Sequence, residues 1–211
     1  RAVLLGDNVK DQDFNWAEFQ DLTSAPATIE AAKACDALGC LPGYKVKSND
    51  AHGAYTQAYL KQEGKRTWLH LPRERWPKSW IGKYTNPVVP LVLALYGHPE
   101  AGGHWEAHCT SKLLPLGFVG IEGWPSVFWN TKEKALLIVY VDDFKLAATG
   151  EAHDRLWPKI QKVIAMGDPV EEGRFLGCYS DSFEGPLDTA EIFSSIIELQ
   201  PRNYERPRLG K

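Results

Sequence analysis

Two adjacent aspartates, Asp142 and Asp143, separate two apolar segments of this chain. They follow the six-residue apolar run 136–141 and precede a second apolar stretch at 144–149, with no Gly or Pro between them to make a turn. Neighbouring carboxylates repel each other and are costly to desolvate unless a positive charge compensates. The pair therefore either occupies an exposed turn or binds a metal ion.

A third carboxylate, Asp50, ends a predicted strand. The segment 43–50 (GYKVKSND) alternates between lysines and other residues, which is typical of a half-buried strand. A sheet can bring the end of such a strand beside the turn at Asp142 and Asp143. Three carboxylates there would suit Mg²⁺, a hard cation that prefers oxygen ligands. Two such ions roughly 3.5–4 Å apart would activate an attacking hydroxyl and stabilise the departing oxygen, as nucleotidyl transfer requires.

The elements that must position these carboxylates follow from hydrophobic spacing. Several strands and helices alternate along the chain, and their mixture predicts an α+β fold with an antiparallel sheet backed by helices, the two aspartates lying at a hairpin tip. The predicted strands are 2–5, 44–50, a short one within 66–77 that precedes a Pro-broken loop, two within 126–141 joined by a charged turn, 144–149 and 173–180. The predicted helices are 23–39, 104–117 and 153–166.

Composition limits the classes of protein that fit. With 211 residues, 44% of them apolar, the chain can form one large domain or two small subdomains. The net charge of −3 argues neither for nor against nucleic acid, although basic residues cluster locally, most simply as solvated faces. Four scattered cysteines predict reduced thiols in an intracellular protein, without a signal peptide or membrane-spanning run. A start at Arg1 inside an apolar strand suggests a fragment of a longer chain.

Several segments, taken in order, resemble one known family. The sequence YVDD (140–143) between apolar strands resembles the catalytic signature of reverse transcriptases. The other segments resemble successive motifs of the reverse transcriptase of copia-type LTR retrotransposons; they are RAVLLG, DAHGAYTQAYL, TWLHLP, LALYGHPEAGGHWEAHC, LGFVGIEGWPSVFW and RFLGCYS. The resemblance covers roughly residues 1–180.

The resemblance implies a fold and an activity. The fold would be the fingers and palm of a right-hand polymerase within 1–180, the palm at roughly 44–57 and 98–180, with 181–211 an unassigned tail and the thumb missing or degenerate. The activity would be RNA-directed DNA synthesis, in which a dNTP is added to a primer 3′-hydroxyl. The implied cofactors are two Mg²⁺ ions, with Mn²⁺ as a substitute. The implied partners are an RNA template, a DNA primer and the remainder of a Pol polyprotein, with no membrane and in a cytoplasmic particle or the nucleus.

The resemblance also assigns roles to individual residues. Asp50, Asp142 and Asp143 are the implied catalytic metal ligands, together with the Ala51 carbonyl. Tyr55 is implied to lie under the incoming sugar and to select deoxynucleotides, although a core aromatic at this position is an alternative. Further implied contacts are Arg1 and Glu100 to the nucleotide, and Tyr140, Val141, Phe175, Leu176 and Gly177 to the nucleic acid or primer.

Two departures from the family favour an alternative function. The Gln-Ala-Pro-Arg of the family reads here as Glu100-Ala101-Gly102-Gly103, which removes an amide and an arginine and adds a negative charge. The tail after residue 181 does not resemble the continuation of the family. The alternative is therefore an inactive transposon-derived remnant that folds and binds nucleic acid.

A zinc site is a weaker alternative elsewhere in the chain. His104 and His108 lie four residues apart, with Cys109 next, and residues at this spacing share a helix face. The zinc-protease pattern requires Glu directly after the first His, where this chain has Trp105. A partly exposed helix face is the preferred interpretation.

Overall fold

The computed structural model describes residues 3–179 except 12, 19–23, 61–65 and 172–173. By its internal contacts the chain divides after Ser180, so all described residues belong to the unit 1–180. The α-helices are α1 (Ile29–Gly39), α2 (Ala101–Leu113) and α3 (Gly150–Val163). The strands are β1 (Tyr44–Asp50), β2 (Trp68–His70), β3 (Val88–Pro90), β4 (Phe118–Ile121), β5 (Trp124–Asn130), β6 (Ala135–Tyr140), β7 (Asp143–Thr149), β8 (Arg174–Phe175) and β9 (Cys178–Tyr179). None of the described helices has both the length and the apolar character needed to cross a membrane.

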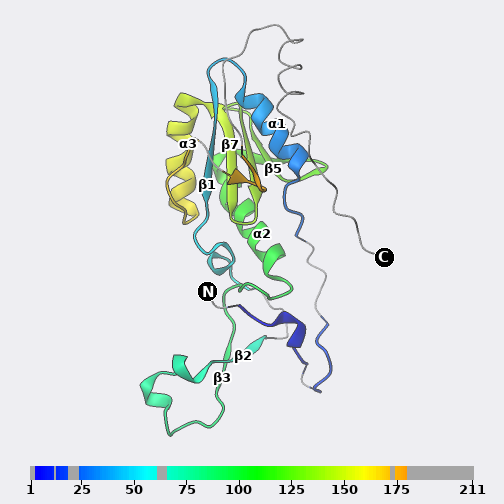
Figure 1. Ribbon diagram of the computed structural model, residues 1–211, viewed down its shortest axis with the longest axis vertical. Coiled ribbons are helices and arrows are strands. Elements are labelled where there is room, and N and C mark those ends of the chain that lie inside the picture. Colours follow the sequence, from blue (N-terminus) through cyan, green and yellow to red (C-terminus); the bar gives the residue numbers. More distant parts are fainter. Residues whose placement is uncertain (1–2, 12, 19–23, 61–65, 172–173, 180–211) are drawn as a thin grey trace, which may run out of the picture. The chain divides into compact units, whose positions relative to one another are not determined.

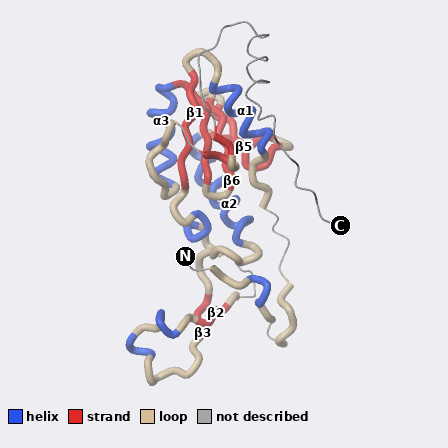
Figure 2. Tube along the Cα trace, in the orientation of Figure 1, coloured by secondary structure: helices blue, strands red, loops and turns tan. Residues whose placement is uncertain are grey.

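Five strands form one antiparallel sheet in the order β1-β7-β6-β5-β4 (Figures 1 and 2). The strands β4 to β7 follow one another as hairpins, whereas β1 reaches its place beside β7 from far upstream in the sequence. This arrangement confirms the predicted α+β fold with an antiparallel sheet backed by helices.

Both faces of the sheet are buried, and the alternation along β6 shows how. Leu137 and Val139 pack with side chains of α2 and α3 in one core. Leu136 and Ile138 point the other way, into a second core formed with α1 and Phe175. Successive side chains of a strand face opposite sides of a sheet, so this continuous apolar run fills both cores at once. Figure 1 shows α1 and α3 on opposite sides of the sheet.

The strands β2 and β3 form a separate two-stranded ribbon. The chain leaves β2, passes through two short 3₁₀ helices, η3 (Arg73–Arg75) and η4 (Lys78–Trp80), and returns to β3 (Figure 1). The backbone pairing continues beyond the ribbon, since Leu91 N donates to Thr67 O and Ala94 N donates to Ala58 O, both at 2.8 Å.

Three predicted elements are wrong in part. The first helix begins at Ile29 and not at residue 23, because the side chain of Thr28 accepts the bond from Ala31 N that caps it. Residues 3–5 are not a strand, and residues 1–2 lie outside the described part. Within the predicted strand 173–180, the described residues 174–179 form a small hairpin, β8–β9, because Leu176 and Gly177 both have positive φ and reverse the chain.

Candidate active site

The hairpin β6–β7 reverses over only two residues, Val141 and Asp142, with Tyr140 and Asp143 as its closing pair. Val141 has φ +54°, a left-handed conformation that is strained for a β-branched residue. Positive φ at the first central residue alone is the pattern of a type II′ turn, in which Gly is the usual residue. Such strain persists only where surrounding contacts hold it.

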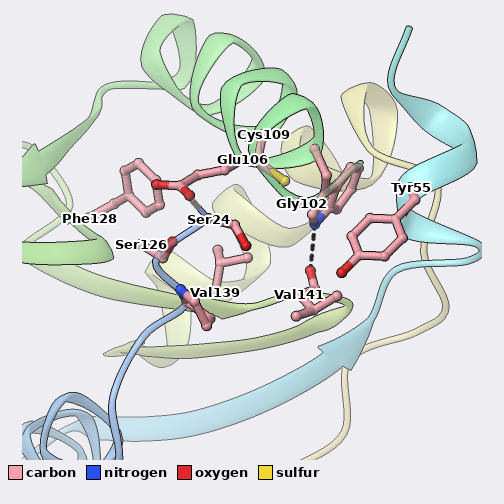
Figure 3. Close-up of a pocket in the computed structure, with 11 residues that line it drawn as sticks. Ser24, Tyr55, Gly102, Glu106, Cys109, Ser126, Phe128, Val139 and Val141 are labelled. Atoms are coloured by element: carbon pink, nitrogen blue, oxygen red, sulfur yellow. Dashed lines mark hydrogen bonds between the residues drawn. The ribbon is translucent and has the colours of Figure 1, made fainter. Parts of the chain in front are cut away.

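Two hydrogen bonds hold the turn at its central carbonyls. The indole Nε1 of Trp105, a buried residue of α2, donates to Val141 O at 2.6 Å. The backbone N of Ala51 donates to Asp142 O at 2.7 Å. Figure 3 shows the Val141 carbonyl as the acceptor of the first bond. The sequence gave no sign of this bond.

The register of the sheet brings two of the three predicted carboxylates together. Asp50, the last residue of β1, is the cross-strand partner of Asp143, the first residue of β7. Partial burial, then the hydrogen bond with the Asp50 side chain and the charges of Asp50 and Asp142, together raise the pKa of Asp143 to about 7. The two side chains therefore share a site in which both cannot be ionised without cost.

A network of amides fixes the end of β1. Asn49 is buried; its Nδ2 donates to Gly167 O and its Oδ1 accepts from Asp50 N, both at 2.9 Å. The backbone of Gly167 donates in turn to Asp50 O at 3.2 Å. Asn49 therefore positions Asp50, a role that the sequence analysis missed. The only feature of the sequence that pointed to this role is that Asn49 directly precedes Asp50 at the end of the predicted strand.

The donor set fits a hard divalent cation in part. A dication beside Asp50 and Asp143 would remove the repulsion that raises the pKa of Asp143, and carboxylate oxygens are the ligands that Mg²⁺ prefers. Within the described ranges, however, no group of three or more His, Cys, Asp or Glu side chains is arranged to hold a metal ion. The fit therefore rests on two carboxylates, with Asp142 adjacent in the turn and Ala51 bonded to it.

A groove of about 430 Å³ opens next to Asp143. It is lined by Tyr140 and Asp143 from the hairpin and by Leu176 and Gly177 from the β8–β9 turn. Phe175 lies behind this turn in the second core, with Nζ of Lys145 at 5.4 Å from its ring centroid. Three residues predicted to contact the primer, Tyr140, Leu176 and Gly177, thus line the groove beside Asp143, one of the predicted catalytic aspartates. A fourth, Phe175, packs in the second core next to the β8–β9 turn.

Tyr55 and Val141 line a second, narrow cavity, against α2 (Figure 3). Tyr55 lies in the 3₁₀ helix η2 (Ala54–Gln57), half-buried, with its ring centroid 4.4 Å from that of Tyr96. The arrangement places Tyr55 beside the strained residue of the acidic hairpin. It is compatible with both predicted roles, sugar contact and core packing.

Glu100, another predicted nucleotide contact, does not join this cluster. Glu100 precedes α2, and its carboxylate, 13% exposed, lies 4.0 Å from Nε2 of His104. Arg1 is outside the described residues. The zinc alternative has no support in the described part of the chain, where Cys109 is buried with a raised pKa and belongs to no three-ligand group.

Comparison of the chain with protein-family models, with curated proteins and with solved structures finds no match in any of the three.

Proposed function

We propose that this chain is an RNA-directed DNA polymerase fragment that adds dNTPs to a primer 3′-hydroxyl at the tip of the β6–β7 hairpin. The observation that carries the proposal is the pairing of Asp50 with Asp143, two carboxylates distant in sequence that share one partly buried site. A carboxylate pair of this kind is suited to divalent metal ions and, through them, to phosphoryl chemistry.

Each residue around the pair has a distinct part in this proposal. Asp50 and Asp143 would hold Mg²⁺ or Mn²⁺, with Asp142 and the Ala51 carbonyl as further ligands implied by the family resemblance. The bound ions would supply charge stabilisation for the attacking and leaving oxygens. Trp105 and the Ala51 amide fix the turn, and so hold Asp143 at the position where it meets Asp50.

Substrate positions follow from the two cavities. The groove beside Tyr140, Asp143, Leu176 and Gly177 would receive the primer end. Tyr55 would lie under the sugar and exclude a 2′-hydroxyl. The finer fold proposed is the fingers and palm of a copia-type reverse transcriptase, with the five-stranded sheet as the palm, acting inside the cell within a larger Pol polyprotein.

Primer extension tests the proposal. We expect the full chain to extend oligo(dT) on poly(rA) with Mg²⁺, and Asp50→Asn and Asp143→Asn to reduce incorporation to background while the chain remains folded by circular dichroism. The matched control is Asp154→Asn, which removes one carboxylate at an exposed position of α3. Incorporation that survives Asp143→Asn would exclude this mechanism.

The second candidate is a folded remnant that binds nucleic acid without catalysis. The absence of a three-ligand group among the described side chains favours it. Mn²⁺ titration followed by electron paramagnetic resonance separates the two candidates. Binding that depends on Asp50 and Asp143 supports the polymerase, whereas no binding by a folded chain supports the remnant.

A further inference from the structure

The ribbon β2–β3 and its connecting loop 71–87 concentrate positive charge. Between Arg66 and Pro90 the chain has five Lys or Arg residues and one acidic residue, Glu74, although its net charge is −3. All five basic side chains are exposed; they are Arg66, Arg73, Arg75, Lys78 and Lys83. A local excess of positive charge on an acidic chain is the electrostatic footprint of a surface for polyanions.

The basic side chains of the loop also differ in their pairing from three basic side chains of β1, β7 and α3. Lys45, Lys145 and Arg155 form ion pairs with Glu171, Asp36 and Glu133, at 2.6 to 3.2 Å. Among the described residues, no ion pair joins a basic side chain of the loop to a carboxylate. The positive charge of the loop is therefore available to an external anion.

Aromatic side chains lie among these cations. Trp68 is 55% exposed on β2, and Tyr84 is 47% exposed near the end of the loop. Trp80 meets the ring of Tyr84 edge-on at 5.8 Å, and Nζ of Lys83 lies 5.4 Å from the Tyr84 centroid. Exposed aromatics beside free cations allow bases to stack while neighbouring side chains neutralise phosphates.

The loop is ordered by its own backbone. Pro72 and Pro77 each precede a 3₁₀ turn with nearly the same dihedrals, φ −55° and ψ 141° or 142°. The indole Nε1 of Trp76 donates to Leu71 O at 2.8 Å and closes the first turn. The exposed cations and rings are thus held on a preformed scaffold, which lowers the entropy lost on binding.

We propose that the β2–β3 ribbon and the loop 71–87 bind single-stranded nucleic acid through phosphate contacts and base stacking. The inference rests on the proposed function, in that it assigns the template strand to this surface. It identifies the surface that would contact the template strand, and this binding can be measured independently of primer extension. A membrane surface is the less suitable partner, because the loop has only three-residue helical turns and no continuous apolar face.

The test is fluorescence anisotropy of the full chain with a labelled oligo(rA) of about 12 nucleotides. The loop variant combines Arg73→Gln, Arg75→Gln, Lys78→Gln and Lys83→Gln. The matched control combines Lys33→Gln, Lys132→Gln, Lys159→Gln and Lys162→Gln, which removes four exposed positive charges elsewhere. A second pair compares Tyr84→Ala with Trp124→Ala, an exposed aromatic on β5.

We expect the original chain and the control to lose about 50-fold in affinity between about 50 and about 200 mM salt, if four phosphates are neutralised. The loop variant should bind at least about tenfold more weakly at low salt and with a shallower salt dependence, and Tyr84→Ala should bind about tenfold more weakly than Trp124→Ala. Equal losses in the loop variant and its control would overturn the inference, as would anionic phospholipid vesicles binding to this loop in place of the oligonucleotide.

Failure of this inference is distinguishable from failure of the proposed function. Asp143→Asn should retain oligonucleotide binding and lose primer extension. If no variant extends a primer but the loop variant still loses binding, the catalytic proposal fails and the strand contact stands. If extension occurs and the loop variant binds and extends like the original chain, the strand contact fails alone.

Discussion

The strained residue Val141 depends on a single indole. The Trp105 side chain is 3% exposed and donates to Val141 O, so its loss would leave a carbonyl of the acidic turn without that donor. We predict that Trp105→Phe lowers the free energy of unfolding by about 1–3 kcal/mol. We also predict that it lowers the kcat of primer extension more than it raises the KM for dNTP, because the turn carries the proposed metal ligands. Urea titration and steady-state kinetics measure the two effects.

The control for this substitution is Trp157→Phe. Trp157 is equally buried, in α3, and its Nε1 donates to Nδ1 of His153 at 3.1 Å. Both variants lose one indole hydrogen bond in the same core, but only Trp105 bonds to the acidic turn. Trp157→Phe should therefore lower stability without the fall in kcat, and equal kinetic losses in both would make Trp105 a packing residue only.

The proton on Asp143 predicts an unusual pH dependence. Its pKa is about 7 in the folded chain and 3.8 as an ordinary aspartate, so between these values the folded state holds a proton that the unfolded state releases. Stability contributed by this group is therefore present below pH 3.8 and is lost as pH rises through about 7. We expect Asp143→Asn to be more stable than the original chain at pH 8 in EDTA and to lose this slope.

Urea unfolding at several pH values measures that slope, with Asp154→Asn as the control that should retain it. Urea unfolding with and without Mg²⁺ at pH 8 is a second measurement, because an ion bound by Asp50 and Asp143 would stabilise the folded state through mass action. The original chain should gain stability with Mg²⁺ and Asp143→Asn should gain less. A flat profile for the original chain would contradict a shared proton.

At the scale of elements, a buried histidine joins the ribbon to the start of α2. Nδ1 of His98 accepts from Glu100 N at 3.2 Å, and its Nε2 lies 3.1 Å from Oγ1 of Thr67. An Nδ1 that accepts must be unprotonated, so this geometry requires the neutral ring. Burial and, secondarily, the charge of His104 lower the pKa of His98 to about 4.

His98 therefore acts on stability in the opposite sense to Asp143. The unfolded chain takes up a proton near pH 6.5 and the folded chain only near 4, so stability is lost as pH falls from 6.5 towards 4. We predict that His98→Gln weakens this acid loss, whereas His70→Gln, at an exposed position of β2, does not. Thermal unfolding between pH 4 and 7 in both variants checks the prediction.

For the whole molecule, the sequence predicted the features that follow from hydrophobic alternation and from the residues that end helices and strands. The strands flanking Asp142 and Asp143, and the end of β1 at Asp50, follow from apolar runs and spacing, so the fold class and the hairpin tip were predictable. The start of α1 was not, because Thr23, Ser24 and Thr28 are all competent caps and the choice depends on packing against the sheet.

Other features depend on tertiary contacts that no local pattern contains. Leu176 reverses the chain at φ +50°, where Asn or Gly is the usual signal, and so β8–β9 was predicted as one strand. The bond from Trp105 to Val141 O joins residues 36 positions apart.

The position of β1 beside β7, a strand far from it in the sequence, has a consequence for folding kinetics. The strands β4 to β7 pair through short hairpins, but β1 must close a long loop to reach β7, and contacts of that kind form late in folding. The two carboxylates would then meet only after the rate-limiting step. At pH 8, Asp143→Asn should slow unfolding and leave the refolding rate nearly unchanged, a φ-value near zero in stopped-flow measurements. The acidic pair would thus affect how long the native state lasts, without delaying its formation.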